Sequence, residues 1–416
     1  MKILFTHPIG NQNVKNLARF LAEDGMIETF ITSIAVYDNS FLEKLAKTSF
    51  LKEFERRRFA EILKPTTKQF PLYELMRFAL PKLGINRFNE HETGIFSIDG
   101  VGRYIDDKAA AYLRKKSKNI GLAYCYEDCA LNTFSAASAL GIKKAYDLPI
   151  GYWKTYRQLL SEEKERRPEW AATITGFKDS DEKLEKKDKE LALADVIYVA
   201  SAFTAKTLEQ NKAIANTKKV IVPYGFPPVN ETKKALPKYD GKRALKLLYV
   251  GGLTQRKGIA SLFEAVEHFK EKVTLTIVGS KASEGCKILD DYIKKHQWIP
   301  TLPHDEILKT MHNHDVLIFP SLFEGFGLVI TEAMSQGTPV VTTNRTVGES
   351  FIRHNENGWL VKPGDTEDII KVIDGLLLHP DTLGQISNQA KETAKKRTWQ
   401  QYGDEMAADL RMYLNR

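Results

Sequence analysis

Short apolar runs alternate with amphipathic stretches along the first half of the chain. Residues 2–7, KILFTH, have the pattern of a buried strand, and in residues 14–25 apolar side chains recur every three or four positions, as on one face of a helix. Ser201 stands where it would cap another such helix. Further strand-like runs occupy residues 121–126, 143–148, 194–200 and 218–225. The pattern predicts repeated strand–helix units.

The second half repeats this alternation after a charged, proline-containing segment, residues 226–244, which we interpret as a linker. Strand-like runs then occupy residues 245–252, 273–279, 315–320 and 339–343. Strands that alternate with helices predict parallel sheets covered on both faces. We therefore expect an α/β protein with two Rossmann-like, doubly wound domains facing one another across a cleft, residues 1–228 and 240–395. Ligands should bind beyond the carboxyl ends of the strands.

Length and composition agree with this picture. The chain has 416 residues, more than a single hydrophobic core usually serves, and 43% of them are hydrophobic, which is ordinary for a globular protein. No apolar run approaches the ~18 to 20 residues that span a bilayer, and MKILFTH is too short an apolar core for a signal peptide. We expect a cytoplasmic protein. The cysteines and histidines show no zinc-type spacing, so no metal site is predicted.

The net charge of +8 favours an anionic partner. Residues 41–60 combine basic side chains at positions 56–58 with Phe50, Leu51 and Phe54 on one helical face. Such a helix could dock on anionic lipid at the inner face of a membrane, although a surface helix packed on its own domain has the same pattern. No basic motif with interleaved aromatic residues accompanies the charge, so nucleic acid is not an expected partner.

Two glutamates with seven residues between them, Glu324 and Glu332, lie inside the apolar stretch FPSLFEGFGLVITEAMSQGTPVVTT. Glu324 falls in the loop after a strand, and Glu332 falls about a turn into the next helix. Gly325 and Gly327 let the backbone approach a ligand, and the start of the helix offers N–H groups to a phosphate. Carboxylates on either side of such a site could grip sugar and ribose hydroxyls. A glycosidase pair is a weaker alternative, because its carboxylates usually face one another across a cleft.

A diphosphate also requires cations. The sequence YVGGLTQRKG places Arg256 and Lys257 in a strand-to-helix loop, where they could neutralise a departing nucleoside diphosphate. The alternative is that both are ordinary solvated loop residues.

These residues, together with TLTIVG and NGWLVKPGD in the same order, resemble glycosyltransferase family 4, the retaining group 1 nucleotide-sugar transferases with a GT-B fold. The matching elements cover most of residues 245–366. The resemblance implies a metal-independent enzyme without a cofactor. It also implies that a terminal helix, about residues 396–416, crosses back to the N-terminal domain.

The resemblance assigns roles to particular residues. Glu332 would bind the ribose of the nucleotide, Glu324 would contact the donor sugar, and Lys257 would bind the diphosphate. Backbone N–H groups would come from Gly325, Phe326, Gly327 and Leu328. Where the family commonly has an arginine, this chain has Gly252, and Arg256 could take over its role in catalysis.

In the N-terminal half the match is looser. Asp147 stands where many family members have a histidine, and it could hold a hydroxyl of the donor sugar. Glu127 and Asp128 follow a predicted strand and could lie on the acceptor or sugar side, although acids at such positions are often turn or capping residues. In the first loop, Asn11 could contact the acceptor and Asn13 the donor, unless Asn13 caps the first helix.

The sequence therefore predicts transfer of a sugar from a nucleoside-diphosphate sugar to a glycan or lipid-linked acceptor, in the synthesis of a surface polysaccharide or lipopolysaccharide. A nucleotide-sugar epimerase or a phosphorylase on the same scaffold, or a non-catalytic protein that binds anionic polymers, are the alternatives. The Asp-Ser-Asp sequence at 179–181 resembles a metal-binding motif but lies in a charged run away from any strand end, so we interpret it as surface.

Overall fold

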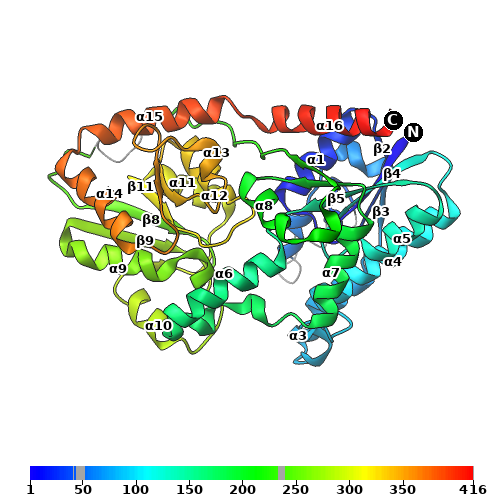
Figure 1. Ribbon diagram of the computed structural model, residues 1–416, viewed down its shortest axis with the longest axis horizontal. Helices are drawn as coiled ribbons and strands as arrows, with labels where there is room; N and C mark the ends of the chain where they lie inside the picture. Colours follow the sequence, from blue (N-terminus) through cyan, green and yellow to red (C-terminus); the bar gives the residue numbers. More distant parts are fainter. Residues whose placement is uncertain (41, 44–51, 233–238, 416) are drawn as a thin grey trace.

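The protein consists of two β-sheets enclosed by helices, which confirms the predicted α/β architecture with two Rossmann-like domains (Figure 1). The computed structural model describes residues 1–40, 42–43, 52–232 and 239–415. Strand pairing within these residues is parallel throughout both sheets.

The N-terminal sheet has the strand order β3-β2-β1-β4-β5-β6-β7. Its strands are β1 (Lys2–Thr6), β2 (Ile27–Thr32), β3 (Thr67–Gln69), β4 (Ile120–Tyr126), β5 (Lys143–Leu148), β6 (Val196–Val199) and β7 (Lys218–Ile221). Its helices are α1 (Gln12–Glu23), α3 (Leu72–Lys82), α4 (Ile98–Lys115), α5 (Leu131–Ala139), α6 (Trp153–Arg166), α7 (Asp181–Leu193) and α8 (Ala202–Thr207). The strand order reverses between β1 and β4, where a doubly wound sheet opens for a ligand.

The C-terminal sheet has the order β10-β9-β8-β11-β12-β13, with the reversal between β8 and β11. Its strands are β8 (Leu245–Val250), β9 (Val273–Val278), β10 (Gln297–Ile299), β11 (Val316–Phe319), β12 (Val340–Thr343) and β13 (Trp359–Val361). Its helices are α9 (Ile259–Phe269), α10 (Lys287–Ile293), α11 (His304–His312), α12 (Leu328–Ser335), α13 (Gly348–Phe351), α14 (Thr366–Leu378) and α15 (Thr382–Lys395). The core strands β11 and β12 are buried along their whole length, as their unbroken apolar runs predict.

Of the two side chains considered as helix caps, Ser201 is one and Asn13 is not. Ser201 accepts a hydrogen bond from the Thr204 N–H, so its predicted capping role is confirmed. The cap of α1 is Asn11, which accepts from the Val14 N–H at 3.2 Å. The alternative that Asn13 caps this helix is wrong, because Asn13 lies within its first turn and is buried.

The predicted amphipathic helix at 41–60 is only partly covered, since residues 41 and 44–51 lie outside the described residues. Residues Lys52–Arg57 form a short 3-10 helix, η1, rather than an α-helix. Phe54 is fully buried, the Arg57 guanidinium pairs with the buried Glu74, and Arg58 pairs with acids of the same domain. These side chains thus have partners inside the protein, as in the alternative of a helix packed on its own domain.

Two parts of the chain connect the sheets besides the linker. Helix α16 (Trp399–Asn415) follows the C-terminal domain and packs against α1 of the N-terminal domain (Figure 1). The bridging segment, residues 153–177, contains α6 and the 3-10 helices η4 (Pro168–Thr173) and η5 (Thr175–Phe177), and it reaches the C-terminal domain. Within the described residues, none of the helices combines the length and apolar character needed to cross a membrane.

Candidate functional site

Arg256, Lys257 and Glu324 meet at the reversal point of the C-terminal sheet. The two cations lie on a 3-10 turn after β8, η8 (Gln255–Lys257), and Glu324 lies in the loop after β11. Arg256 Nη1 donates to the Phe323 carbonyl at 2.7 Å and lies 3.2 Å from Glu324 Oε2, and Lys257 Nζ pairs with the same carboxylate oxygen. The local topology places the three predicted residues together, since the loops of β8 and β11 leave the sheet on either side of its reversal point.

This cluster carries an excess of positive charge in a poorly hydrated place. Burial, followed by repulsion from Arg256, lowers the pKa of Lys257 well below its usual range. Burial also lowers the pKa of Arg256. One carboxylate faces two cations, so an additional anion beside them would relieve the repulsion.

Glu332 lies on the inner face of α12 and is only 7% exposed. Burial raises its pKa, and the nearby His304 opposes this effect. His304 Nδ1 lies 3.9 Å from Glu332 Oε1, at the start of α11. His304 is not among the residues predicted from the sequence, although its position just beyond β10 was an available signal.

The glycine-rich loop before α12 forms part of the domain interface. The Gly325 carbonyl accepts hydrogen bonds from Ser201 Oγ at 2.6 Å and Thr204 Oγ1 at 3.0 Å. A Cβ at position 325 would overlap the Pro149 carbonyl oxygen, so the N-terminal domain itself requires a glycine here. The Phe326 ring packs against Tyr224 with the centroids 4.7 Å apart, and thus also faces the N-terminal domain.

Gly327 and Leu328 form the start of α12. Gly327 has φ +89° and stands at the N-cap, where no side chain caps the helix. The first N–H groups of a helix have no acceptors within it, so this end suits a phosphate. A Cβ added at Gly252, after β8, would meet no atom within 4 Å, so its surroundings leave space for a side chain at this position.

Asp147 is buried in β5 and accepts a hydrogen bond from the Tyr124 hydroxyl at 2.6 Å. Burial raises the pKa of Asp147 to about 7. Asn13 is similarly buried and donates to the Tyr224 hydroxyl at 2.9 Å. Tyr124 and Tyr224 are themselves buried, so in this structure Asp147 and Asn13 bond to side chains of the protein interior.

Glu127 and Asp128 follow β4 and share Lys187 as a counter-ion, at 3.3 and 3.5 Å. Burial raises the pKa of Glu127 to about 7, with Lys187 opposing the shift. Asp128 is in the left-handed region at φ +69° and remains partly exposed.

His7, which the sequence analysis also left out, organises the first loop. Its Nδ1 accepts from the N–H groups of Ile9 and Gly10, at 3.1 and 2.7 Å. Burial and the charge of Arg57 lower the pKa of His7 to about 3, so the ring stays neutral near pH 7. The signal for it was a histidine directly after the first strand.

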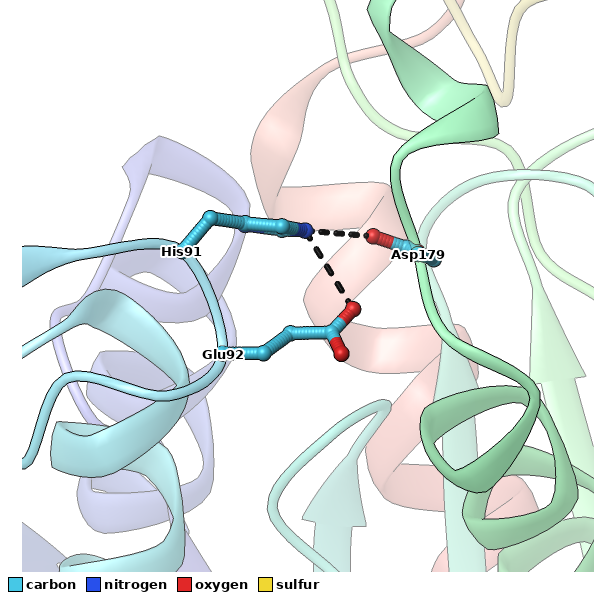
Figure 2. A group of neighbouring side chains, drawn as sticks. All are labelled: His91, Glu92 and Asp179. Carbon is cyan, nitrogen blue, oxygen red and sulfur yellow. Dashed lines mark hydrogen bonds and ion pairs between the residues drawn. The ribbon is translucent and has the colours of Figure 1, made fainter.

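The Asp-Ser-Asp sequence contributes to a charged cluster on the N-terminal domain. His91 Nε2 lies 3.0 Å from Asp179 Oδ1 and 3.3 Å from Glu92 Oε1, as Figure 2 shows. Lys183 Nζ already lies 3.1 Å from the same Asp179 oxygen, and the Ser180 N–H donates to Glu92. One ligand atom from each of His91, Glu92 and Asp179 lies close enough to the others to hold a metal ion, so the interpretation of this sequence as surface stays a prediction.

The bridging segment also escaped the sequence analysis. Trp170 is buried and stacks on Phe263 and Tyr292 of the C-terminal domain, with centroids 6.0 and 5.8 Å apart. Arg167 binds Glu264 through both terminal nitrogens, and Gln255 Nε2 donates to Glu163 Oε1 at 2.6 Å. Gln255 adjoins Arg256, so the bridging segment supports the 3-10 turn that carries Arg256 and Lys257.

Part of the chain is similar in sequence to known glycosyltransferases. Residues 229–396 match the family model for glycosyl transferases group 1. Glycogen synthase of Mycobacterium tuberculosis is 31% identical over 157 residues, which are 35% of this chain and 37% of that protein. The capsular polysaccharide biosynthesis glycosyltransferase CapM of Staphylococcus aureus is 28% identical over 227 residues, 49% of this chain and 58% of the relative. The matched part thus spans roughly a third to three fifths of these relatives.

Solved structures resemble the whole chain. Sucrose-phosphate synthase from Thermosynechococcus elongatus superposes with a TM-score of 0.66 at 18% identity, covering 100% of this chain and 99% of that one. Anabaena HepE in complex with UDP-glucose gives a TM-score of 0.63 at 17% identity, covering 99% and 100%. At these identities the likeness establishes the fold, which is the predicted GT-B arrangement. Residues 229–396 are therefore similar to the group 1 glycosyltransferases, in agreement with the resemblance of the motifs in this part of the chain.

Proposed function

We propose that the protein is a retaining glycosyltransferase that moves a sugar from a nucleoside-diphosphate sugar to a hydroxyl of a glycan or lipid-linked acceptor. The observation that carries this proposal is the half-buried cluster of Arg256, Lys257 and Glu324 close to the start of α12, with Glu332 one turn into that helix. An unbalanced pair of cations beside a helix N-terminus suits a diphosphate.

In this proposal the diphosphate lies between the cationic turn and the N-terminus of α12, and it takes over the counter-charge that Glu324 provides. Glu324 then accepts hydrogen bonds from the donor sugar, and Glu332 accepts them from the ribose diol. Arg256 and Lys257 stabilise the charge that develops on the leaving diphosphate. They supply this charge without a metal ion, which is why we propose a metal-independent reaction.

The acceptor approaches from the N-terminal domain, where Asn11, Glu127 and Asp128 follow its strands. Its hydroxyl attacks on the face that the diphosphate leaves, and a phosphate oxygen of the donor takes the proton. Surface polysaccharide or lipopolysaccharide synthesis is the setting we propose. Relatives named for capsular polysaccharide and amylovoran biosynthesis support it. Its place in family 4 is part of the same proposal.

A thermal-shift panel of nucleoside diphosphates and nucleotide sugars, measured with EDTA present, tests the donor site. We expect one nucleotide sugar to raise the melting temperature of the wild type and to have at least ten-fold weaker affinity for Glu332→Gln, because a buried hydrogen bond to a carboxylate is worth about 1.5 to 3 kcal/mol. Glu356→Gln, at an exposed acid in a distant turn, is the matched control. A panel without any shift would contradict the proposal.

The stereochemistry is tested on the product with the donor that the panel identifies. The anomeric configuration of the transferred sugar, read by NMR coupling constants, should equal that of the donor. An altered donor sugar formed without acceptor would indicate the epimerase instead, and an inverted product would contradict retention.

A further inference from the structure

A groove of about 870 Å³ opens on the C-terminal domain at the amino ends of its strands. Lys246 lies near the start of β8, Gln297 at the start of β10, and His314 just before β11. The turn that carries Arg256 and Lys257 follows the other end of β8. The groove, which we call the amino-edge groove, is therefore at the opposite edge of the sheet from the proposed donor site. Cavities of this size commonly hold small molecules.

Polar side chains form the floor of the amino-edge groove. Lys246 pairs in register with Thr274, and Thr276 with Gln297, so these four side chains share one face of the sheet at its amino edge. Thr276 Oγ1 lies 3.2 Å from Gln297 Oε1 and 2.9 Å from His314 Nε2, which holds these three side chains in place. The faces of a parallel sheet are normally apolar and covered by helices. Here Lys246 and Thr274 are exposed, so the polar part of the floor is open to a ligand.

The charges that line the groove are mainly positive. Three lysines, Lys246, Lys270 and Lys295, are accompanied by a single carboxylate, Glu267, which pairs with Lys295. Lys246 and Lys270 are exposed, and neither ammonium group forms a hydrogen bond or an ion pair with another described residue. Two positive charges of the lining thus have no counter-ion, which favours an anionic ligand.

Acidic side chains next to the groove have cations of their own. Asp315, just before β11, accepts hydrogen bonds from Arg243 Nη1 at 2.6 Å and from Nη2 at 2.8 Å. Glu271 adjoins Lys272 in the short turn after α9. These acids therefore do not neutralise the two lysines that lack a partner.

Neutral polar groups beside the lysines suit the hydroxyl groups of a sugar. The side chains of Thr274 and Asn313 are exposed on the groove and form no hydrogen bond with the rest of the described chain, and Gln297 Nε2 donates none. His296 stacks on Phe263 in the wall, with the ring planes 2° apart, and its Nε2 is buried without a hydrogen-bond partner among the described residues. Hydroxyl, amide and imidazole groups all exchange hydrogen bonds with sugar hydroxyls.

We propose that the amino-edge groove binds a small sugar phosphate, whose phosphate is held by Lys246 and Lys270 and whose hydroxyl groups lie over Thr274, Gln297 and Asn313. A phosphate monoester carries about −1.5 to −2 charges near pH 7, which matches the two lysines without counter-ions better than the single charge of a carboxylate does. The groove is separate from the donor site, so this binding does not rest on the proposed function.

The position of the groove gives such a ligand a route to the donor site. Strands β8 and β11 begin at the groove and end at the loops that carry Arg256, Lys257 and Glu324. A ligand that ties their amino ends together would stabilise the two strands that position these side chains. The bound sugar phosphate is therefore an effector of the domain, since it lies at the far edge of the sheet from the proposed reaction.

Calorimetric titration with the 6-phosphates of glucose, galactose and mannose tests the groove. The titrations use the full chain with Lys257→Ala, so that the proposed diphosphate site does not contribute. We expect at least one hexose phosphate to bind ten-fold or more tightly than inorganic phosphate or the free sugar. The added substitutions Lys246→Ala/Lys270→Ala should weaken this binding at least ten-fold, because they remove the charge-assisted hydrogen bonds to the phosphate. Lys189→Ala, at an exposed lysine of the N-terminal domain, is the matched control.

Histidine signals locate the bound ligand. In protein labelled with ¹⁵N-histidine, the hexose phosphate should shift the imidazole resonances of His296 and His314, which are assigned from the variants His296→Gln and His314→Gln. These shifts should be absent in Lys246→Ala/Lys270→Ala. Resonances that do not move while heat is released would place the ligand elsewhere and overturn the proposal.

Three further outcomes would contradict the sugar-phosphate site: no binding of any hexose phosphate, equal affinity of the double variant and the Lys189→Ala control, or inorganic phosphate that binds as tightly as the hexose phosphates. The last result would indicate an anion site without recognition of a sugar. The thermal shift caused by nucleotide sugars is measured in parallel on Lys246→Ala/Lys270→Ala with Lys257 intact. Its retention shows an intact donor site, so the two proposals fail independently.

Discussion

The carboxylate of Glu324 plays two parts at the scale of single residues. In the free protein it neutralises Arg256 and Lys257, and in the proposed complex it turns to the donor sugar. Cationic side chains that are held in place for a leaving group need such a temporary counter-ion, because a buried charge without a partner of opposite sign costs free energy.

Replacing Glu324 by glutamine should therefore separate affinity from transfer. We expect Glu324→Gln to lower the melting temperature of the free protein, to strengthen binding of the free nucleoside diphosphate by about 1 to 2 kcal/mol, and to abolish sugar transfer. Calorimetric titration with the diphosphate measures the affinity, with Glu349→Gln at an exposed acid as control. Weaker diphosphate binding in the variant would show that Glu324 does not compete for the cations.

Asp147 makes stability depend on pH. Its pKa rises from the ordinary value of 3.8 to about 7 in the folded protein, so its contribution to stability is complete below pH 4 and is lost as the pH rises from there through 7. Asp147→Asn should gain about 2 to 3 kcal/mol over the wild type between pH 5 and pH 8. Melting temperatures of the wild type and of Asp147→Asn at the two pH values measure this difference in stability. Glu127 and Glu190 titrate in both proteins, so their contributions to the difference cancel. A constant difference would mean that Asp147 titrates near its ordinary pKa.

At the scale of elements, the loop before α12 contacts both domains and also forms part of the proposed donor site. The Phe323 side chain is fully buried between Tyr156 of α6 and Phe203 of α8, with centroids 5.2 and 5.3 Å away. The adjacent Glu324 thus takes its position from a contact made by the other domain. In the proposed function, closing of the domains would therefore also complete the donor site.

Phe323→Ala should loosen this contact. Truncating a buried phenylalanine costs about 3 to 5 kcal/mol, and here the loss falls on the closed arrangement of the domains. We expect a larger radius of gyration by small-angle X-ray scattering and weaker donor binding. Phe269→Ala, within the C-terminal domain, should lower the melting temperature without changing the radius. An unchanged radius in Phe323→Ala would show that the other contacts suffice to hold the domains.

At the scale of the whole molecule, the features that could be predicted from the sequence are those that local patterns encode. The strand–helix alternation indicated the two parallel sheets, and the motif around Glu324 and Glu332 indicated the family, because both are encoded in short contiguous stretches. The docking of Trp170 on the other domain could not be predicted, since its partner Phe263 lies far along the chain. The burial of Asp147 was missed for the same reason: a carboxylate at a strand end normally indicates exposure, and only the packed tyrosines show otherwise.

The bridging segment has a consequence for dividing the protein. Residues 239–395 include a complete sheet, but a fragment with these limits would leave the ring faces of Phe263 and Tyr292 uncovered where Trp170 now stacks. The stability of the C-terminal domain on its own therefore depends on a piece of chain that precedes it by some sixty residues of sequence. A peptide comprising residues 153–177, added in trans, would supply the missing aromatic surface. The residues that pack together as the C-terminal domain are therefore not one contiguous stretch of the sequence.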